Sequence, residues 1–424
     1  MSLIRKKWIE FLAWILKKRA CYVLHKFRPL VVAVTGSVGK SSTKEAIYAV
    51  IAEKYPVMRN QGNLNNELGV PLSIIRKKKP QGVINWIKFV FNSGAYVAGI
   101  KEYPAYLVLE LATDKKGDIK YLCDMVQPTI GVVTNVGESH MEFFGNVKKT
   151  VIEKRSLIES LPKEGRAVLN YDDENVLSMK KYTKAKVISY GLKKGADIVA
   201  TNVAINLKGT SFKLVYNGSI VPVNLQMVGC SYVRSALAAV AVGLTIGMDV
   251  MDIVSGLQKW EPLPGRMRIV EGKNQMIIFD DSYNASPDSV INAIESLKLI
   301  PLKERKVAIL GSMWELGKAT RKGHLEIGKR AGRYFDLLLC VEEFGDIIKE
   351  GAMQSGFDSD KIIVFKDTSE LLGKLDGLLK TGDVVLVKGS QGKNRLEKVV
   401  KKIMKYPKMA KEILVRQSDE WLKK

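Results

Sequence analysis

The sequence predicts an α/β fold with two mostly parallel sheets, one in a central domain and one in a C-terminal Rossmann-like domain. Three observations lead to this prediction: apolar runs alternate with helical stretches, a glycine-rich loop follows the first run, and proline and glycine interrupt the pattern at residues 263–266. A chain of 424 residues has the length of two or three domains. We therefore expect a helix at residues 1–28, the central domain at 29–265 and the C-terminal domain at 266–424.

The expected N-terminal helix is basic and amphipathic. Trp8, Phe11, Leu12 and Leu16 recur at helical spacing, and lysine and arginine flank them, as at residues 17–19. The segment is too short and too interrupted by charge to span a bilayer, and it lacks the cleavage pattern of a signal peptide. Two interpretations stay open: a helix that packs on the next domain, which we favour slightly, and an anchor that touches the inner face of the membrane.

The central domain is expected to contain buried strands at residues 31–34, 106–110, 130–135 and 167–170. Short alternating runs between residues 196 and 225 predict a small antiparallel insertion, and a helix is expected at 236–246. The aromatic segment at 83–100 fits both a packed helix and a membrane contact. The C-terminal domain is expected to contain strands at residues 276–279, 307–310, 337–341, 362–365 and 384–387.

The chain is strongly basic, with a formal net charge of +23. Such a charge attracts nucleotides, nucleic acid or anionic membrane surfaces, but here it is spread along the chain and no nucleic-acid-binding module is recognised. We therefore expect no nucleic-acid partner. The four cysteines, Cys21, Cys123, Cys230 and Cys340, are scattered without a paired motif, so neither a disulfide framework nor a zinc site is predicted. A reducing cytoplasm fits this usage.

A phosphate-binding loop is predicted where the first apolar run meets a helix, at residues 31–43 (VVAVTGSVGKSST). Glycines let successive backbone N–H groups converge on an anion, Lys40 can reach the β- and γ-phosphates, and the Ser41 hydroxyl can bind Mg²⁺. The spacing is tighter than the usual Walker pattern, so we rely on the strand, loop and helix context. This loop predicts that the central domain is a P-loop domain that binds nucleotide phosphates. The residues expected to bind the nucleotide here are Thr35, Gly36, Ser37, Val38, Gly39, Lys40, Ser41 and Ser42.

Metal ligands are expected at the ends of two strands. Glu110 ends one predicted strand, and Asn135 and His140 follow another. Glu110 with Ser41 suits one Mg²⁺ ion, whereas histidine is a less usual ligand for this metal. Taken alone, Glu110 is better explained as an acidic residue in a turn, and His140 as a hydrogen-bonded loop histidine.

Eight motifs then occur in the order that is found in Mur ligases, and the chain resembles this family from Pro29 to its C-terminus. The motifs are residues 35–41 (TGSVGKS), 62–71 (GNLNNELGVP), Glu110 followed by 117–119 (GDI), 135–142 (NVGESHME), 264–266 (PGR), 280–288 (DDSYNASPD), 311–317 (GSMWELG) with His324, and 387–390 (VKGS). The resemblance implies ATP-dependent amide formation through an acyl phosphate in peptidoglycan precursor synthesis. It further implies a nucleotide-linked muramoyl peptide as one substrate and D-Ala-D-Ala or a similar amine as the other.

The resemblance also implies roles for particular residues. Lys40, His140, Lys154 and Arg266 fall at catalytic positions, and Lys154 falls where the family has a lysine carboxylated by CO₂, which would hold a second Mg²⁺ beside His140. Without the resemblance, Lys154 reads as a solvated helical lysine. Nucleotide contacts are implied for Asn135, Arg266, Asp281, Tyr283 and Asn284, and substrate contacts for Asn63, Asn65, Asn66, Lys388 and Ser390, with Arg395 in the same basic segment.

Two departures from the family pattern bear on its substrates. Only about thirty residues precede the phosphate strand, so we expect the family's UDP-binding N-terminal domain to be absent or replaced by the basic helix. Ser231 and Ser235 stand where the family usually has histidine and asparagine near the adenine, so the contacts with the base are expected to differ. Ala112 and Ser312 are smaller departures.

Alternatives follow from these departures. One is a related ligase for another amino acid or peptide, of the pseudomurein or folylpolyglutamate type. Another is a membrane-associated P-loop ATPase without ligase activity, suggested by the net charge and by the N-terminal helix. Our leading expectation is a monomeric, cytoplasmic peptide ligase.

Overall fold

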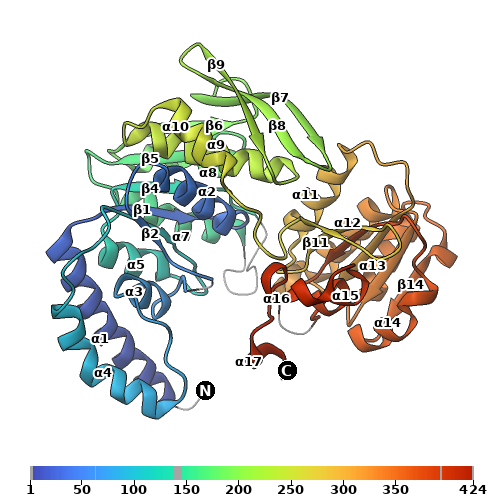
Figure 1. The fold of residues 1–424 in the computed structure, drawn as a ribbon, viewed down its shortest axis with the longest axis horizontal. Coiled ribbons are helices and arrows are strands. Elements are labelled where there is room, and N and C mark those ends of the chain that lie inside the picture. Colours follow the sequence, from blue (N-terminus) through green and yellow to red (C-terminus); the bar gives the residue numbers. More distant parts are fainter. Residues whose placement is uncertain (1–2, 63, 138–145, 392–393, 423–424) are drawn as a thin grey trace.

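The computed structural model describes residues 3–62, 64–137, 146–391 and 394–422, and it contains two sheets that face each other across a central gap between ribbons (Figure 1). The first is a nine-stranded sheet with the order β2-β3-β1-β4-β5-β6-β7-β8-β9. Its strands are β1 (Leu30–Thr35), β2 (Val57–Arg59), β3 (Tyr106–Glu110), β4 (Ile130–Val133), β5 (Arg166–Asn170), β6 (Lys186–Gly191), β7 (Ile198–Asn206), β8 (Gly209–Tyr216) and β9 (Ser219–Leu225).

The strands from β2 to β7 pair in parallel, so their carboxyl ends lie at one edge of the sheet. The alternating segment at 196–225 forms β7, β8 and β9, which pair antiparallel and lengthen the same sheet through the pairing of β7 with β6. The predicted strand at 130–135 ends at Val133, so Asn135 lies in the loop beyond the sheet edge.

Helices cover both faces of this sheet, which explains why the central strands read as continuous apolar runs. Val32 and Val34 face a core shared with α2 (Lys40–Ala52), α9 (Cys230–Thr245) and α10 (Val250–Gln258). Val31 and Ala33 point to the other face, toward α3 (Gly69–Ile74), α5 (Asp118–Val126) and α7 (Val147–Glu159). The alternation follows from the two-residue repeat of a strand.

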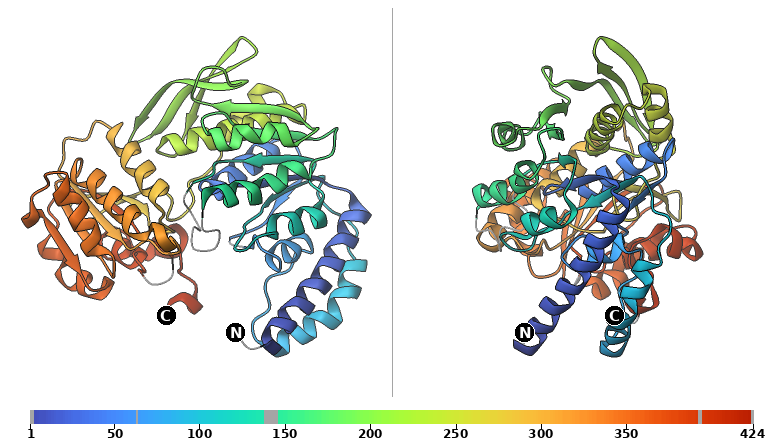
Figure 2. Two further views of the ribbon diagram at one scale, coloured as in Figure 1. Left: turned by 180° about the vertical axis from the view of Figure 1, so that it is seen from behind. Right: turned by 90° about the vertical axis from the view of Figure 1, so that its left-hand side faces the viewer.

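Two long helices, α1 (Leu3–Phe27) and α4 (Val83–Ala98), flank this second face and extend to one end of the molecule, where the right-hand view of Figure 2 shows their outer ends apart (Figures 1 and 2). Lys26 Nζ donates to the carbonyls of Ala98 at 3.2 Å and Ile100 at 2.7 Å, which joins their inner ends. Leu12, Leu16, Ala20 and Val23 of α1 are buried, so one face of α1 packs as expected. Among the described residues, neither these helices nor any other is long and apolar enough to cross a membrane.

The second sheet has six strands in the order β10-β11-β15-β12-β13-β14, all parallel except β10. Its strands are β10 (Arg268–Glu271), β11 (Ile277–Asp281), β12 (Lys306–Gly311), β13 (Leu337–Val341), β14 (Ile362–Phe365) and β15 (Val384–Lys388). Its helices are α11 (Pro287–Lys298), α12 (Thr320–Gly332), α13 (Gly345–Gln354), α14 (Thr368–Lys374) and α15 (Glu397–Ile403). The α/β class with a large, mostly parallel sheet and a second sheet is confirmed.

Short helices complete the described chain. They are α8 (Glu174–Leu177), η1 (Ser178–Tyr182), η2 (Gly317–Ala319), η3 (Ser359–Lys361), η4 (Leu375–Gly377), η5 (Pro407–Met409), α16 (Ala410–Ile413) and α17 (Asp419–Leu422). The two sheets are joined by packed side chains as well as by the chain itself: Tyr232, Trp260 and Met267 belong to one continuous core with residues of both sheets. This core brings the carboxyl edge of the first sheet opposite β11 and β15.

Candidate active site between the two sheets

A cavity of about 330 Å³ lies between the two sheets, where sequence-predicted site residues meet from both. The first sheet contributes the loop after β1, the end of β3 and Lys154 of α7. The other side contributes Arg266 and residues that follow β11 and end β15. Site residues predicted from the sequence that line it are Ser37, Val38, Gly39, Lys40, Ser41, Ser42, Asn65, Asn66, Glu110, Lys154, Arg266, Asp281, Tyr283, Asn284 and Lys388.

The loop after β1 has the backbone of a phosphate cradle. Gly39 has φ 83° immediately before α2, a conformation that favours glycine. A side chain at Gly36 would collide with the adjacent loop, because its Cβ would lie 1.9 Å from Thr134 Oγ1. Asn135 shapes the loop by accepting the backbone N–H of Val38 at 2.7 Å. Thr35 instead donates its buried hydroxyl to Leu111 O at 2.9 Å and ties β1 to the end of β3.

Two lysines converge at this loop, Lys154, which is buried, and Lys40, which is half-buried. Lys40 Nζ donates to the carbonyl of Gly36 at 2.8 Å and to that of Ser37 at 3.1 Å. Lys154 Nζ donates to the same Gly36 carbonyl at 2.9 Å. Burial lowers the pKa of both ammonium groups, and the positive charge of Lys40 lowers the pKa of Lys154 further. Lys154 therefore has an enlarged population of neutral amine.

Glu110 forms the acidic part of the cavity at the end of β3. Its Oε2 accepts from Ser41 Oγ at 2.8 Å, and its Oε1 accepts from Asn65 Nδ2 at 3.0 Å. Arg266 Nη2 donates to Ser41 Oγ at 3.1 Å. A serine hydroxyl and a carboxylate that adjoin a phosphate cradle are hard oxygen ligands of the kind that Mg²⁺ uses, so these residues fit one such ion.

Two predicted site residues, Asn63 and His140, lie outside the described residues. Within the described chain, no group of three histidine, cysteine or acidic side chains is arranged to hold a metal by itself. Phosphate oxygens and water would therefore have to supply the remaining ligands for an ion at Ser41 and Glu110.

The second sheet contributes a cationic and aromatic wall. The Arg266 guanidinium lies 4.2 Å from the centre of the Tyr283 ring. Lys388 Nζ forms a 2.5 Å ion pair with Asp281 Oδ2 and donates to the carbonyl of Asn284 at 3.1 Å. These contacts fix the end of β11 and the segment after it, which together carry three of the predicted nucleotide-contacting residues.

A second hollow of about 330 Å³ adjoins the phosphate loop, with Val38, Gly39, Ser231 and Ser235 among the residues that line both cavities. Its other residues include Asn170, Asp172 and Arg234. Arg234 Nε donates to Asp172 Oδ2 at 3.0 Å, and Thr43 Oγ1 donates to Ser235 Oγ at 2.9 Å. The two serines that depart from the family pattern thus lie beside the loop.

Other predicted residues are held away from the cavity or serve structure. Ser390 is buried and donates its hydroxyl to Ala285 O at 3.1 Å. Asn66 lines the cavity, but its side chain accepts from Gly69 N at 2.9 Å at the start of α3. Arg395 pairs at 2.5 Å with Glu397, whose side chain is fully buried.

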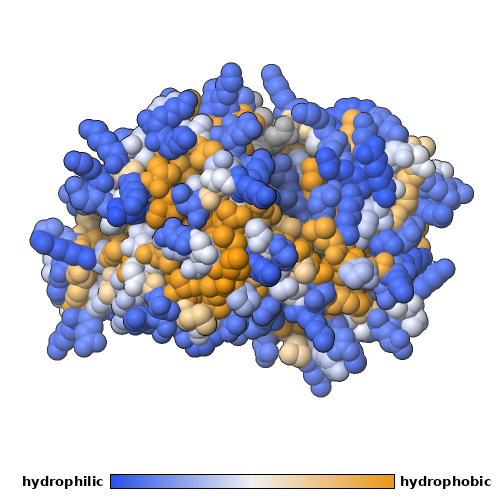
Figure 3. All heavy atoms as spheres, turned by 90° about the horizontal axis from the view of Figure 1, so that it is seen from above, coloured by the Kyte–Doolittle hydropathy of each residue, from blue (hydrophilic) through white to orange (hydrophobic). Residues whose placement is uncertain are grey.

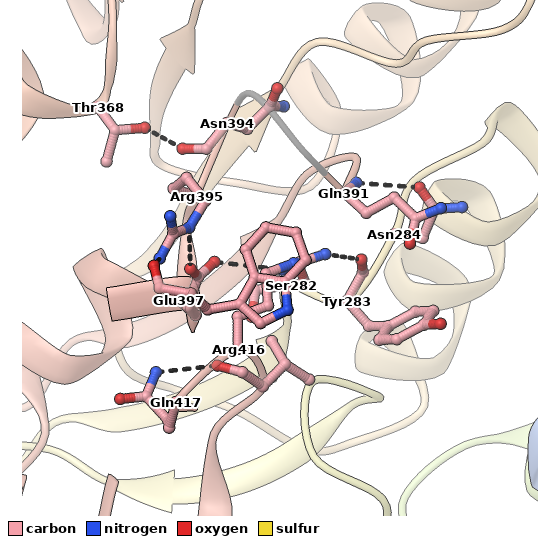
Figure 4. A network of polar contacts seen from close by, with 12 residues as sticks. Ser282, Tyr283, Asn284, Thr368, Gln391, Asn394, Arg395, Glu397, Arg416 and Gln417 are labelled. Atoms are coloured by element: carbon pink, nitrogen blue, oxygen red, sulfur yellow. Dashed lines mark hydrogen bonds and ion pairs between the residues drawn. The ribbon is translucent and has the colours of Figure 1, made fainter. Parts of the chain in front are cut away.

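The same Glu397 carboxylate lies within 3.2 Å of Arg416 (Figure 4). Arg416 in turn donates to the carbonyls of Ser282 at 3.1 Å and Tyr283 at 2.5 Å. The chain near the C-terminus therefore supports the backbone that presents Tyr283 to the cavity.

Two structural contributors were not predicted from the sequence. Asn60 exchanges hydrogen bonds with the backbone of Glu110, donating to its carbonyl at 3.0 Å and accepting its N–H at 2.9 Å. Glu153 accepts the N–H groups of Gly117 at 2.7 Å and Ile119 at 2.9 Å at the start of α5. Asn60 lies two residues before the 62–71 motif, and this proximity could have suggested that Asn60 belongs to the site. Glu153 offered none, because its partners are more than thirty residues away.

Comparison with known proteins agrees with both halves of this site. Residues 34–243 match the Mur ligase middle domain, and residues 265–391 match the Mur ligase glutamate ligase domain. The UDP-N-acetylmuramoyl-tripeptide–D-alanyl-D-alanine ligase of Bacillus subtilis is 29% identical over 395 residues, which cover 92% of this chain and 79% of that protein. The ligase of the same name from Mycobacterium tuberculosis H37Rv is 32% identical over 380 residues, covering 85% and 70%.

Solved structures show the same relationship. MurF from Acinetobacter baumannii superposes with a TM-score of 0.78 at 26% identity, covering 91% of this chain and 79% of that one. MurF from Thermotoga maritima in complex with ADP gives 0.77 at 30% identity, covering 92% and 83%. Folylpolyglutamate synthase of Mycobacterium tuberculosis shares the fold with a TM-score of 0.66 at 14% identity over 91% of this chain and 95% of that one. Because the matches include both sheets and the cavity between them, the chain belongs to the Mur ligase family of ATP-dependent ligases.

Proposed function

We propose that this ligase joins the terminal carboxylate of a UDP-muramoyl tripeptide to the amino group of D-Ala-D-Ala and consumes one ATP. The observation that supports this most is the cavity in which a phosphate cradle, Glu110 and Arg266 converge from both sides. The substrate pair comes from the relatives named for that reaction, at 28 to 32% identity. Structures that represent the alternative ligases share only the fold with this chain. The sequence identity is 19% for a pseudomurein peptide ligase from Methanothermus fervidus and 14% for the folylpolyglutamate synthase.

The proposed chemistry begins with activation of the carboxylate. A carboxylate is a poor electrophile, and transfer of the γ-phosphoryl group converts one of its oxygens into part of a leaving group. The loop N–H groups, Lys40 and Arg266 would neutralise phosphate charge and hold the reacting groups in line. The amine then attacks the acyl phosphate through a tetrahedral oxyanion, and inorganic phosphate departs.

Ser41 and Glu110 would hold Mg²⁺, which when bound neutralises charge on the phosphates. Lys154 would hold a second ion as its carbamate, together with His140. The carbamate would form when the neutral Nζ attacks CO₂, making an N–C bond and releasing a proton. Support comes from the lowered pKa of Lys154 and from its burial within 2.9 Å of the phosphate loop.

The second hollow is our candidate site for the nucleotide base, because it continues from the phosphate loop and offers Asn170, Asp172 and Arg234. Asn65 and Lys388 are the substrate-side candidates that line the main cavity. Ser390 is buried and bonded to the carbonyl of Ala285, so it would hold the neighbouring backbone in place and would not contact the substrate.

The proposal includes a monomer in the cytoplasm, in peripheral contact with the inner face of the membrane through α1. The four cysteines carry free thiols in the structure, as is usual in a reducing compartment. Light scattering coupled to size-exclusion chromatography tests the monomer directly, and a stable dimer at working concentration contradicts it.

The decisive experiment incubates the purified chain with ATP, Mg²⁺, UDP-muramoyl tripeptide and D-Ala-D-Ala. We expect phosphate release to require both co-substrates, and mass spectrometry to show the pentapeptide product. Equal phosphate release without any amine would instead favour the ATPase alternative. A panel of other acids and amines separates the remaining alternative, since turnover with another pair and none with this one would replace the proposed substrates.

Carboxylation of Lys154 has its own measurement. In ¹³CO₂-equilibrated buffer we expect a carbamate carbon signal from the wild type and none from Lys154→Arg, whose guanidinium stays protonated. The absence of the signal from the wild type contradicts the carbamate without touching the ligase assignment.

A further inference from the structure

Helix α4 exposes a stripe of large apolar side chains. Ile84 is 70% exposed, Ile87 42% and Phe91 80%, and spacings of three and four residues place them on one face. The opposite face carries Trp86, Ser93 and Val97, which are buried. One side of α4 therefore packs on the protein while the other presents apolar surface to the surroundings.

Helix α1 is built the same way. Phe11 is 45% exposed and Trp14 57% exposed, and the next two turns of that face carry Lys18 and Tyr22, both exposed. Lys7 precedes them on the same face and is exposed too. We call the exposed residues Lys7, Phe11, Trp14, Lys18, Tyr22, Ile84, Ile87, Lys88 and Phe91 the α1–α4 surface.

The charge around this surface is almost entirely positive. Helix α1 and residues 76–101 together contain thirteen lysine and arginine residues and a single acidic residue, Glu10. These segments therefore contribute about half of the net charge of +23. Arg76, Lys78 and Lys79 are exposed in the connection that leads into α4.

Exposure of apolar residues alone would not distinguish this surface. The face that carries β9 and α10 also shows apolar residues among hydrophilic ones (Figure 3), including Ile220 at 63% and Met251 at 65% exposure. Acidic residues accompany them there, since Asp249 and Asp252 lie beside Met251. The combination of apolar stripe and one-signed charge is what sets the α1–α4 surface apart.

None of its residues lines the cavity between the sheets. Both helices extend from the first sheet to the end of the molecule where the N-terminus lies (Figures 1 and 2). Their exposed faces are thus available to a partner while the cavity is occupied.

We propose that the α1–α4 surface binds the surface of an anionic lipid bilayer. Its apolar side chains enter the boundary between headgroups and acyl chains, its tryptophan and tyrosine lie at headgroup level, and its lysines contact lipid phosphates. A bilayer fits better than an acidic protein because the apolar residues lie on two helices and are flanked by lysine. The surface also contains tryptophan and tyrosine, which are typical of membrane interfaces. The proposal extends the membrane contact from α1 to a two-helix surface and does not depend on ligase activity.

The test is co-sedimentation of the full chain with vesicles of phosphatidylcholine containing phosphatidylglycerol, compared with pure phosphatidylcholine. We expect binding to the anionic vesicles and at least tenfold weaker binding to the neutral ones. Ile84→Ser with Phe91→Ser should weaken binding to anionic vesicles at least tenfold. Ile220→Ser with Met251→Ser is the matched control, because it removes apolar residues elsewhere that are also more than 60% exposed, and it should bind as the wild type does.

A charge variant separates steering by lysine from apolar insertion. Lys78→Glu with Lys79→Glu should reduce the preference for anionic lipid, and raising the salt concentration should reproduce that loss in the wild type. Ligase turnover without vesicles is expected to be unchanged in the Ile84 and Phe91 variant and in the Lys78 and Lys79 variant. A failure to bind lipid can therefore be distinguished from a failure of the ligase assignment.

Three outcomes overturn the proposal. One is no binding of the wild type to anionic vesicles at low salt. Another is equal loss of binding in the Ile220 and Met251 control. The third is a concentration-dependent dimer that the Ile84 and Phe91 variant abolishes, which would assign the surface to a second copy of the chain.

Discussion

The two sides of the active-site cavity each contribute a lysine whose side chain is only 2% exposed, but the two lysines are held differently. Lys388, from the six-stranded sheet, forms a 2.5 Å ion pair with Asp281. Lys154, from the side of the nine-stranded sheet, donates to the neutral carbonyl of Gly36. Equal burial therefore produces a compensated charge on one side and a poorly compensated one on the other.

The difference indicates a division of labour across the cavity. The pairing of Lys388 with Asp281 and its bond to the carbonyl of Asn284 fix the end of β11 and the segment after it, which is a structural task. An amine whose pKa burial lowers well below its usual value is chemically available, which is what carbamate formation requires. Lys154 on the phosphate-loop side should thus take part in the chemistry, while the pair of Lys388 with Asp281 should stabilise the opposite side.

The largest expected effect tests the chemical side. Lys40→Ala should reduce ATP turnover at least about a thousandfold, because Lys40 Nζ is bonded to two carbonyls of the phosphate loop and lies where it can stabilise negative charge on the transferring phosphoryl group. Phosphate release under saturating substrates measures it. Lys54→Ala, just beyond the same helix and exposed, is the control and should keep wild-type turnover. Intact turnover in Lys40→Ala contradicts the whole assignment of this side.

Lys388→Met tests the structural side. Removing this lysine leaves the carboxylate of Asp281 buried without its cation, and breaking a buried pair in this way costs about 3 to 5 kcal/mol of unfolding free energy. Urea denaturation of the nucleotide-free protein measures the loss. The double variant Lys388→Met with Asp281→Leu should recover most of it, because neither charge is then stranded. A loss below about 1 kcal/mol would show that Asp281 finds another partner.

Much of this architecture was predictable because it depends on local patterns. The strands at 31–34, 106–110 and 337–341 are continuous apolar runs between helical stretches, and β1, β3 and β13 lie there. The strand β2 was missed because three residues leave no period to detect. That β7 to β9 continue the central sheet was also missed, since the pairing of β7 with β6 joins segments whose sequences do not reveal it.

The candidate site likewise combines residues that local sequence patterns could predict with residues that they could not. Lys40, Ser41 and Glu110 belong to motifs at strand ends, so the sequence could predict that they meet. The burial of Lys154 could not be predicted, because it arises from the packing of α7 beneath the phosphate loop. In the sequence, a solvated lysine on an amphipathic helix looks the same as Lys154. The two differ only in the residues that surround the side chain in the folded protein.

Lys154→Met tests whether the poorly compensated charge of the Lys154 ammonium group lowers the free energy of unfolding. An apolar side chain of similar size relieves the desolvation of a buried cation, although the hydrogen bond to Gly36 is lost. In CO₂-depleted buffer without nucleotide we expect the unfolding free energy to stay unchanged or to rise by about 1 kcal/mol, while ligase turnover is lost. Wild-type stability should approach that of the variant as the pH rises toward 10, because the unfolded chain binds the extra proton.

A loss as large as that of Lys388→Met would remove the contrast between the two lysines. It would mean that Lys154 has a strong partner, and crystals of the wild type without nucleotide would then show a carboxylate against its Nζ. Lys154→Arg serves as the matched control, since it keeps a charge in the same buried place and should be less stable than Lys154→Met.

The smallest effect concerns Asp280, the neighbour of the paired Asp281. Burial raises the pKa of Asp280 to about 6 from the usual 3.8, although Ser282 donates to its Oδ1 through its hydroxyl at 2.6 Å and its N–H at 3.1 Å. Between these pH values the folded state holds more protons than the unfolded state, so stability falls as the pH rises through the window and stays lower above it. Asp280→Asn keeps the accepting oxygen without the charge, and should gain about 2 kcal/mol over the wild type at pH 7.5 relative to pH 4. Urea denaturation across this range measures the gain, with the exposed Asp360→Asn as control. A pH-independent difference would show that burial does not raise the pKa of the Asp280 carboxyl.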